Sequence, residues 1–315
     1  MRTARGLAEV PAELPAPVLA LGTFDGIHLG HRHVIGAALA RAGDLGGTAV
    51  VVTFEPHPLE VLRPSTDPVL LTTLEERLEL LGDVGVDLAL VLPFDLEFSQ
   101  ISADAWLDEI LAGRLGARAV FAGSSYTFGH RRRGTAARLA EWGRARGVEV
   151  HLTPAVLVSG EPVSSSRIRT ALREGLVDEA ARLLGRPYGL RGAVAAGLGR
   201  GRTIGFPTAN LAVPPRKVLL ALGVYATVVS ADGRRYGGAT NVGRRPTFGG
   251  GQVTVETHLL GFDGSLVGRT IDVSFVQRLR EERAFSGPDA LARQIRDDVE
   301  QARQLLAWVG PSIIR

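Results

Sequence analysis

The chain of 315 residues is 45% hydrophobic and 22% charged, an ordinary globular composition with enough length for two domains. Its 36 basic and 33 acidic side chains leave a net charge of +3, too small to indicate nucleic-acid binding, and the lack of cysteine excludes disulfides, thiolate metal sites and a cysteine nucleophile. The longest apolar runs have the length of a strand rather than of a membrane span, and no signal-peptide core is present. We therefore expect a cytoplasmic protein.

The first half of the chain alternates short apolar strands with helical stretches. The predicted strands cover 17–21, 48–53, 86–92, 117–122 and 148–152; the predicted helices start near 31 and cover 73–81, 103–111 and 135–146. Apolar strands joined by helices predict an α/β fold with a parallel sheet. Ligands bind such sheets at the carboxyl ends of the strands, so we expect a site in the loops after Leu21, Thr53 and Ala122.

The second half changes character near residue 185. Segments 224–229, 253–259 and 271–275 have the two-residue period of strands and are separated by glycine-rich turns, which predicts a small antiparallel barrel. Residues 288–309 carry apolar side chains at helical spacing, with Pro288 placed to begin a terminal helix. We place the domains at 1–184 and 185–315.

The loop after the first strand, residues 22–31 (GTFDGIHLGH), has the features of a phosphate site. His28 and His31 stand three residues apart where a helix is expected to begin, so both can face one side of its N-terminus. That end of a helix carries free N–H groups and a positive dipole suited to phosphate. Two surface histidines at a helix start are the alternative interpretation.

Two further segments support a nucleotide site. Residues 163–169 (VSSSRIR) place hydroxyls and an arginine at the start of a helix, where they form either a phosphate cradle or a plain N-cap. Residues 53–58 (TFEPHP) leave the second strand through two prolines, which stiffen a loop at the expected ligand edge.

In this order, the three segments resemble the adenylyltransferase module of prokaryotic bifunctional riboflavin kinase/FAD synthetases. The resemblance implies a Rossmann-like nucleotidyltransferase domain in which His28 and His31 act in catalysis of adenylyl transfer from ATP to FMN. The implied ATP-binding residues are Gly22, Thr23, Phe24, Asp25, Gly26, His28, His31, Ser165, Ser166 and Arg169. The implied FMN-binding residues are His57, Pro58, Ser125 and Tyr126.

Residues 123–129 (GSSYTFG) depart from the pattern of that family, which has Asp or Asn followed by Phe where this chain has Ser125 and Tyr126. In the family this segment lies beside the flavin, so the departure concerns flavin acceptance rather than phosphate chemistry. Serine still forms hydrogen bonds and tyrosine preserves the ring.

A second group of candidate residues lies in the predicted barrel. The glycine-rich run 197–205 does not have the spacing of a dinucleotide-binding loop, and strand signals follow it. Thr208 and Asn210 in the next segment, 205–210 (GFPTAN), can together serve Mg²⁺ and a nucleotide phosphate, or simply form a surface turn. Strand alternation puts Glu256 on the face opposite Val253, Val255 and Thr257, where it is either a solvent-facing residue or a placed general base.

Segments 184–188, 205–211, 223–225, 241–248, 255–256 and 279–285 resemble, in this order, the riboflavin kinase module of the same family. The resemblance implies that Gly205, Thr208 and Asn210 bind ATP, that Thr208 and Asn210 hold Mg²⁺, and that Glu256 is the base toward the ribityl hydroxyl. It also implies that Glu256 and Arg280 bind riboflavin.

The leading hypothesis is thus a bifunctional enzyme that converts riboflavin to FMN and FMN to FAD with ATP and Mg²⁺. A riboflavin kinase whose first module is impaired or altered in flavin acceptance is the nearest alternative. A flavin-sensing or RNA-binding regulator built on the basic loop His130–Arg133 is another. We expect small-molecule substrates, no nucleic-acid or membrane partner, and a monomer or weak homo-oligomer.

Overall fold

The computed structural model describes residues 1–63, 70–197, 201, 204–244 and 253–309. The chain divides into two compact units, Met1–Ser165 and Ser166–Arg315. Parts of two sequence motifs, the glycine-rich run 197–205 and the segment 241–248, lie outside the described residues.

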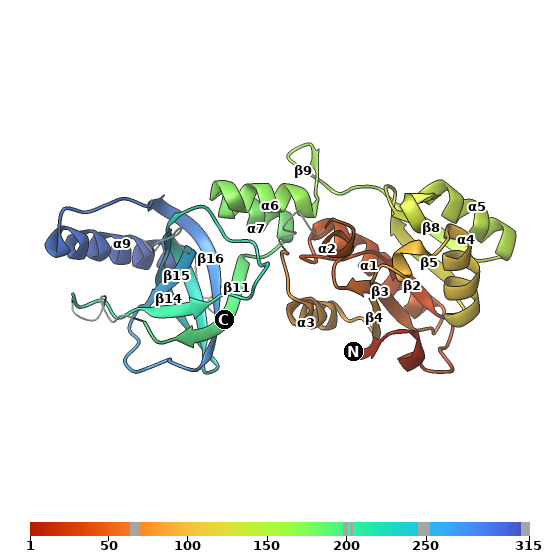
Figure 1. The fold of residues 1–315 in the computed structure, drawn as a ribbon, viewed down its shortest axis with the longest axis horizontal. Helices are drawn as coiled ribbons and strands as arrows, with labels where there is room; N and C mark the ends of the chain where they lie inside the picture. The colour runs from red at the N-terminus through yellow and green to blue at the C-terminus, as the bar shows by residue number, and fades with distance from the viewer. Residues whose placement is uncertain (64–69, 198–200, 202–203, 245–252, 310–315) are drawn as a thin grey trace. The chain divides into compact units, whose positions relative to one another are not determined.

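The first unit is built on a six-stranded parallel sheet in the order β1-β4-β3-β2-β5-β8 (Figure 1). Its strands are β1 (Arg2–Arg5), β2 (Val18–Leu21), β3 (Ala49–Glu55), β4 (Leu88–Pro93), β5 (Ala119–Gly123) and β8 (Glu149–Thr153). Five of them match predicted strands to within a few residues, which confirms the parallel sheet. The edge strand β1 was not predicted, because Ala4 is its one buried residue and its sequence carries no apolar run.

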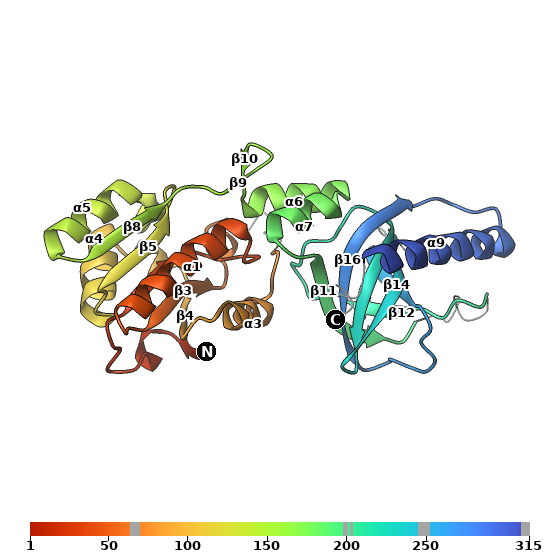
Figure 2. The same cartoon turned by 180° about the vertical axis from the view of Figure 1, so that it is seen from behind.

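Helices cover both faces of this sheet (Figure 2). The helical segments are α1 (Leu29–Asp44), α2 (Pro58–Leu62), α3 (Leu74–Val84), α4 (Ala103–Ala105), the π-helix η3 (Trp106–Arg114) and α5 (Ala136–Arg146), with the short 3₁₀ turns η1 (Leu7–Glu9), η2 (Phe98–Gln100) and η4 (His130–Arg132). One apolar core joins the sheet to α1 and α3, and a second joins the other face to η3 and α5. Strands buried on both faces explain the continuous apolar runs of the sequence.

Two small hairpins complete the first unit. They are β6 (Thr127–Phe128) with β7 (Gly134–Thr135), and β9 (Leu157–Val158) with β10 (Glu161–Pro162). The first hairpin directly follows β5 and carries the end of the segment 123–129. Gly134 is needed there, because a Cβ at this position would lie 2.4 Å from the buried Phe128 ring.

The second unit contains a closed six-stranded barrel in the order β11-β12-β15-β14-β13-β16, with antiparallel neighbours. Its strands are β11 (Tyr188–Ala195), β12 (Ala209–Ala212), β13 (Gly223–Ala231), β14 (Arg234–Arg244), β15 (Val253–Leu259) and β16 (Thr270–Glu281). The barrel prediction is confirmed. Three fully buried hydroxyls, Thr227, Thr240 and Thr257, are hydrogen-bonded in a chain across β13, β14 and β15 at 2.7 and 2.8 Å.

The helices α6 (Ser165–Glu174), α7 (Val177–Leu184) and α9 (Pro288–Val309) belong wholly or largely to this unit. The terminal helix α9 has the predicted bounds and packs outside the barrel on β13, β14 and β16. Its apolar stripe, which includes Val299 and Ala302, covers Ala226 and Ala239 of the barrel. Among the described residues, no helix is long and apolar enough to cross a membrane.

Candidate active sites

The sheet brings the three predicted ligand loops of the first unit to one edge. β2 lies between β3 and β5, and all three run parallel, so the loops that follow them leave from the same side. These loops begin at Gly22, Pro56 and Ser124. The starts of consecutive loops are about 30 to 70 residues apart in the sequence, and the strand order places these loops next to one another.

His28 is the N-cap of α1. Its Nδ1 accepts a hydrogen bond from the backbone N–H of His31 at 3.2 Å, which leaves Nε2 as the nitrogen that carries the proton in the neutral ring. The two imidazole rings are stacked, with centroids 3.5 Å apart and planes inclined by 18°. A Cβ at Gly30 would lie 3.1 Å from the His28 ring, so glycine makes this position of the ring possible. Both predicted histidines therefore face one place at the helix N-terminus.

The loop between β2 and α1 has an unusual backbone. Phe24 and Ile27 have φ angles of 51° and 41°, which side-chain-bearing residues rarely adopt, and Gly26 has a φ of 87°. Phe24 and Ile27 are buried, and the Phe24 ring meets His31 edge-on at 5.3 Å. Buried apolar side chains thus hold a strained loop that carries polar groups, an arrangement typical of functional sites.

Asp25 points into the protein rather than toward solvent and is fully buried. Its carboxylate accepts hydrogen bonds from the backbone N–H of Leu71 at 3.0 Å, and from the N–H and hydroxyl of Thr72 at 2.9 and 3.0 Å. The Thr72 hydroxyl also accepts from Gly26 N–H at 3.0 Å. The side chain of Asp25 therefore fixes the loop to the segment that precedes α3.

Ser165, at the start of α6, donates a hydrogen bond from its hydroxyl to the carbonyl oxygen of Asp25 at 3.0 Å. The first residue of this helix thus contacts the loop that leads to His28. Ser166 and Arg169 lie in the first turns of α6, and the Arg167 guanidinium pairs with Glu179 of α7 at 2.9 Å.

The loop after β3 carries His57, which is buried and caps the short helix α2. Its Nδ1 accepts from Leu59 N–H at 3.2 Å, while the Glu60 carboxylate accepts from His57 N–H at 3.3 Å. Pro58 is the first residue of α2, a position that suits its fixed φ. Both ring orientation and loop direction are therefore set by local hydrogen bonds.

In the segment after β5, the two residues that depart from the family pattern lie in different environments. Ser125 is exposed, whereas Tyr126 is partly buried and its ring stacks on Phe128 with centroids 5.5 Å apart. Burial raises the pKa of the Tyr126 phenol, so the hydroxyl stays protonated at neutral pH. Tyr126 thus keeps the aromatic packing of the expected phenylalanine.

In the barrel, strand register brings the predicted kinase residues together. Asn210 of β12 stands directly opposite Glu256 of β15, and Glu256 stands directly opposite Asn241 of β14 on its other side. Opposite residues of antiparallel strands share a face, so these three side chains form a row. Val255 and Thr257 are buried while Glu256 is half-buried, which confirms the predicted alternation.

Thr208 directly precedes β12 and is held near this row by its neighbours. His258 Nδ1 donates to the carbonyl oxygen of Pro207 at 2.8 Å, and its ring meets Phe206 edge-on. Gly205 has a φ of 87° in the turn before this segment. Asn210 and Glu256 therefore lie on adjacent strands, and Thr208 lies directly before the first of them.

Two glycines approach this row closely. A Cβ at Gly197 would lie 2.2 Å from Asn210 Nδ2, and one at Gly201 would lie 2.3 Å from the Phe206 carbonyl oxygen and 3.3 Å from Thr208 Oγ1. The described ends of the glycine-rich run therefore lie against the side chains that the sequence assigns to ATP. Glycine is required because any side chain would displace them.

Arg280 of β16 is separated from β15 by β14 and β13 in the barrel order. Its guanidinium makes two-pronged contact with the buried Asp298 of α9, with Nε and Nη2 at 2.9 and 2.8 Å from the carboxylate oxygens. Arg280 Nη1 donates to the Glu281 carbonyl oxygen, and its guanidinium lies 5.6 Å from the Phe285 ring centre. Arg280 thus joins the barrel to the terminal helix.

Sequence reasoning did not assign a role to Asn241 or Asp298. Asn241 was visible only as part of a matching segment, because its place beside Glu256 follows from strand register. Asp298 had a signal that was not used: it is an acidic residue next to Val299 in the apolar stripe of a helix.

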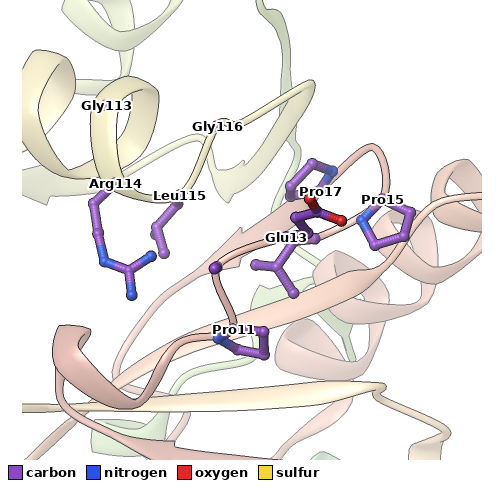
Figure 3. Close-up of a pocket in the computed structure, with 10 residues that line it drawn as sticks. Pro11, Glu13, Pro15, Pro17, Gly113, Arg114, Leu115 and Gly116 are labelled. Atoms are coloured by element: carbon purple, nitrogen blue, oxygen red, sulfur yellow. The ribbon is translucent and has the colours of Figure 1, made fainter.

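A cavity of about 410 Å³ lies at the opposite edge of the parallel sheet (Figure 3). Its lining comes from Pro11–Pro17 and Gly113–Gly116, segments that precede β2 and β5. The Arg114 guanidinium beside it donates to the Val10 carbonyl oxygen at 2.7 Å. None of the predicted site residues lines this cavity.

The comparisons with known proteins bear on both units. Residues 10–167 match the FAD synthetase family model, and residues 184–306 match the riboflavin kinase family model. The bifunctional riboflavin kinase/FMN adenylyltransferase of Pseudomonas fluorescens is 39% identical over 308 residues, covering 98% of each chain. This chain belongs to that bifunctional family.

Other relatives agree. Proteins of the same name from Bacillus subtilis and Escherichia coli K12 are 36% and 34% identical, covering 93% and 99% of each chain. A solved Streptococcus pneumoniae structure described as a macrolide-efflux protein superposes with a TM-score of 0.87 at 32% identity, covering 96% of this chain and 99% of that one. The chain is a bifunctional riboflavin kinase and FMN adenylyltransferase acting on flavins and ATP, which confirms the two activities of the leading hypothesis over the regulator.

Proposed function

We propose that the two reactions are divided between the two sites, with FMN adenylylation at the sheet edge and riboflavin phosphorylation in the barrel. The riboflavin kinase match contains all the candidate kinase residues, and the FAD synthetase match contains all the candidate adenylyltransferase residues except Arg169. The observation that carries the proposal is the cross-strand row of Asn210, Glu256 and Asn241 in one unit and the stacked His28–His31 pair in the other.

At the sheet edge, an oxygen of the FMN phosphate attacks the α-phosphorus of ATP and the bond to the β-phosphate breaks, releasing pyrophosphate. His28 donates from Nε2 and, with His31, stabilises the charge that develops on the phosphates. The hydrogen bond from His31 N–H to His28 Nδ1 supports this role, because it orients the ring and leaves Nε2–H as donor. The N-terminus of α1 adds a favourable dipole.

The other ATP-binding residues divide into those that act through their backbone and those that act through their side chains. Gly22, Thr23, Phe24 and Gly26 form the loop backbone that faces the nucleotide, and Asp25 acts by holding this loop, since its carboxylate is occupied by Leu71 and Thr72. Ser165, Ser166 and Arg169 bind the β- and γ-phosphates. The hydrogen bond from Ser165 to the loop supports their assignment.

FMN lies against the loops after β3 and β5. His57 and Pro58 form one side, and Ser125 and Tyr126 form the other. The exposed hydroxyl of Ser125 is available for a hydrogen bond to the flavin, and the ring of Tyr126 packs as the expected phenylalanine would. We infer that this departure from the family pattern is compatible with adenylylation.

In the barrel, Glu256 accepts the proton of the riboflavin 5′-hydroxyl as its oxygen attacks the γ-phosphorus of ATP, and ADP leaves. Thr208, Asn210 and the turn at Gly205 bind the ATP phosphates. The close approach of Gly197 and Gly201 to these side chains supports the assignment, because glycine lets a ligand or the chain itself come near Asn210 and Thr208. Arg280 contributes to riboflavin binding by fixing the end of β16 to α9.

The kinase residues fit a magnesium ion that arrives with ATP. Thr208 and Asn210 offer neutral oxygen ligands, and the described residues contain no cluster of three or more acidic or histidine side chains that would hold a metal by themselves. Mg²⁺ commonly takes one or two protein ligands and completes its shell with phosphates and water. When bound, the ion neutralises phosphate charge.

We propose 1–184 and 185–315 as the two modules, which the start of the riboflavin kinase match at residue 184 supports. The helices α6 and α7 lie between or at the ends of the matched ranges. We also propose a cytoplasmic enzyme that works as a monomer or weak homo-oligomer, to which the cysteine-free composition is suited.

The test is chromatography of the products after incubation with Mg²⁺-ATP and either riboflavin or FMN. FAD formed from both substrates is the expected result. FMN from riboflavin, without FAD from either substrate, would contradict FMN adenylylation at the sheet edge.

A further inference from the structure

Arg77 of α3 is the largest fully buried side chain among the described residues. It stands in a run of charged residues, Glu75, Glu76 and Arg77, on a helix that begins with a capping box at Thr73. Burying an arginine is costly unless its charge and N–H groups are compensated. An apolar side chain at this position would be sufficient to pack α3 on the sheet. The contacts of Arg77 therefore indicate the function of the arginine.

The guanidinium reaches the last residues of β3. Nη1 donates to Thr53 Oγ1 at 3.2 Å and to the Phe54 carbonyl oxygen at 3.0 Å. Nη2 lies 3.5 Å from a carboxylate oxygen of Glu55, which is joined directly to Pro56 and His57. Arg77 therefore holds the strand end from which the proposed FMN loop departs.

The same contact extends to the proposed ATP loop. The Thr53 hydroxyl accepts from Arg77 and donates to the carbonyl oxygen of Thr23 at 2.8 Å, so both of its hydrogen-bonding functions are used. Thr23 lies between Gly22 and Phe24, at the start of the strained loop that leads to His28. One buried cation is thus linked to the ATP loop through two hydrogen bonds and is bonded directly to the strand end that leads into the FMN loop.

Electrostatic interactions also link Arg77 to Asp25 and, through it, to the segment before α3. Burial lowers the pKa of Arg77, and the negative charges of Asp25 and Glu55 oppose that shift. Asp25 is itself hydrogen-bonded to Leu71 and Thr72, directly before α3. The β2 loop, the β3 loop and the start of α3 therefore converge on one guanidinium.

We propose that Arg77 is a positioning residue for FMN adenylylation that fixes the ATP loop and the FMN loop relative to one another. The inference rests on the proposed function, which assigns residues 22–28 to ATP and residues 57–58 to FMN. Arg77 is fully buried and does not touch substrate; it acts through Thr53, Phe54 and Glu55. Misplacing reacting groups by about 1 Å can cost on the order of 100-fold in rate, so a small shift of either loop is sufficient.

The test is steady-state kinetics of FMN adenylylation by the full-length Arg77→Met and Arg77→Lys variants. For Arg77→Met we expect KM to rise for both ATP and FMN and kcat/KM to fall about 10- to 100-fold. Arg77→Lys should recover part of this loss, because an ammonium group restores the charge and one of the donated hydrogen bonds. The far-UV circular dichroism spectrum and the cooperativity of urea unfolding should match the parent, which reports that the α/β unit is folded, and riboflavin kinase activity should stay within about twofold.

Arg41→Met is the matched control. This variant also loses a two-pronged contact, because the Arg41 guanidinium donates two hydrogen bonds to Glu149. The pair lies at the start of β8, whereas the proposed substrate loops follow the ends of the strands. The control should leave both KM values unchanged. A purely structural role for Arg77 would lower the active fraction, and hence the apparent kcat, without moving KM, and that result would overturn the proposal.

If the Arg77→Met variant does not fold, the kinetics of the Thr53→Val variant test the proposal instead. This substitution removes the hydroxyl that links Arg77 to Thr23 but keeps the volume, and it should raise KM for ATP more than KM for FMN. An unchanged KM for ATP would overturn the proposal. Failure of the underlying site assignment is seen separately, because His28→Asn would then leave adenylylation intact.

Discussion

The two units fix their reactive side chains by different means. In the barrel, Asn210, Glu256 and Asn241 are placed by the backbone ladder of three neighbouring strands, so register alone sets their spacing. In the α/β unit the candidate residues sit on loops beyond the strand ends, and buried polar side chains such as Asp25 and Arg77 hold those loops. The barrel site therefore depends on the hydrogen bonds between neighbouring strands, whereas the sheet-edge site depends on buried residues that hold its loops.

The largest expected effect is in the barrel. Glu256→Gln removes the proposed base while keeping the size of the side chain, and FMN formation from riboflavin should fall about 10²- to 10⁴-fold. FMN adenylylation by the same preparation should be unchanged, because the sheet-edge site does not include this residue. Assays of each reaction with purified protein check this. Retained riboflavin phosphorylation would show that Glu256 is only a strand residue.

The corresponding change in the α/β unit is His28→Asn. Asparagine is a good N-cap, so α1 should remain stable, but the Nε2–H donor is lost. We expect FAD formation to fall about 100-fold, with FMN still formed from riboflavin. His33→Asn, the same substitution at an exposed position of α1, is the control and should have no effect. Equal loss in both variants would contradict the role of His28.

A smaller effect tests how closely the glycine-rich run approaches the kinase row. Gly197→Ala places a Cβ 2.2 Å from Asn210 Nδ2, so Asn210 must move. We expect KM for ATP in the kinase reaction to rise about tenfold, roughly the cost of one displaced hydrogen-bonding group. Gly189→Ala on β11 is the control, since its Cβ has ordinary contacts at 3.7 Å or more. An unchanged KM for Gly197→Ala would remove Asn210 from the ATP site.

The smallest expected effect concerns the edge of the sheet away from the site. The hydrogen-bonded Arg41 guanidinium lowers the pKa of Glu149, so the pair stabilises the folded chain above the ordinary glutamate pKa. This contribution is lost as the pH falls through the lowered pKa of the folded state. Glu149→Gln should therefore be slightly less stable than the parent at neutral pH and equally stable below that pKa. Urea unfolding at both pH values checks the sign; a difference that grows on acidification would contradict it.

The elements that could be predicted from sequence are those with a strong period. The apolar runs at β2 to β5 and the alternation at β15 were sufficient to predict these strands. The terminal helix has the predicted bounds because Pro288 marks its start. β1 was missed because a four-residue edge strand with one buried side chain has no pattern to detect. The π-helix η3 was expected as part of an ordinary helix, since side-chain periodicity does not reveal the hydrogen-bond pattern.

For the sites, motifs identified the residues but not what holds them. Asp25 looked like a ligand residue, and only the fold reveals its bonds to Leu71 and Thr72, some 46 positions away. Arg77 stands beside two glutamates and has the sequence signature of a solvent-facing helix, yet it is fully buried. Arg280 was expected beside flavin, and its pairing with Asp298 depends on how α9 packs on the barrel. Long-range polar contacts of this kind leave no local signal.

The most direct test of the central claim, two independent sites on one chain, is a mixing experiment. Glu256→Gln and His28→Asn variants are incubated with riboflavin and Mg²⁺-ATP, separately and together, and the flavins are separated by chromatography. We predict at least about 100-fold less FAD from either variant alone than from the parent, and restored FAD formation in the mixture, because FMN made by the His28→Asn chain is adenylylated by the Glu256→Gln chain. FAD formation at the parent's rate by a single variant, or no recovery in the mixture, would contradict the claim.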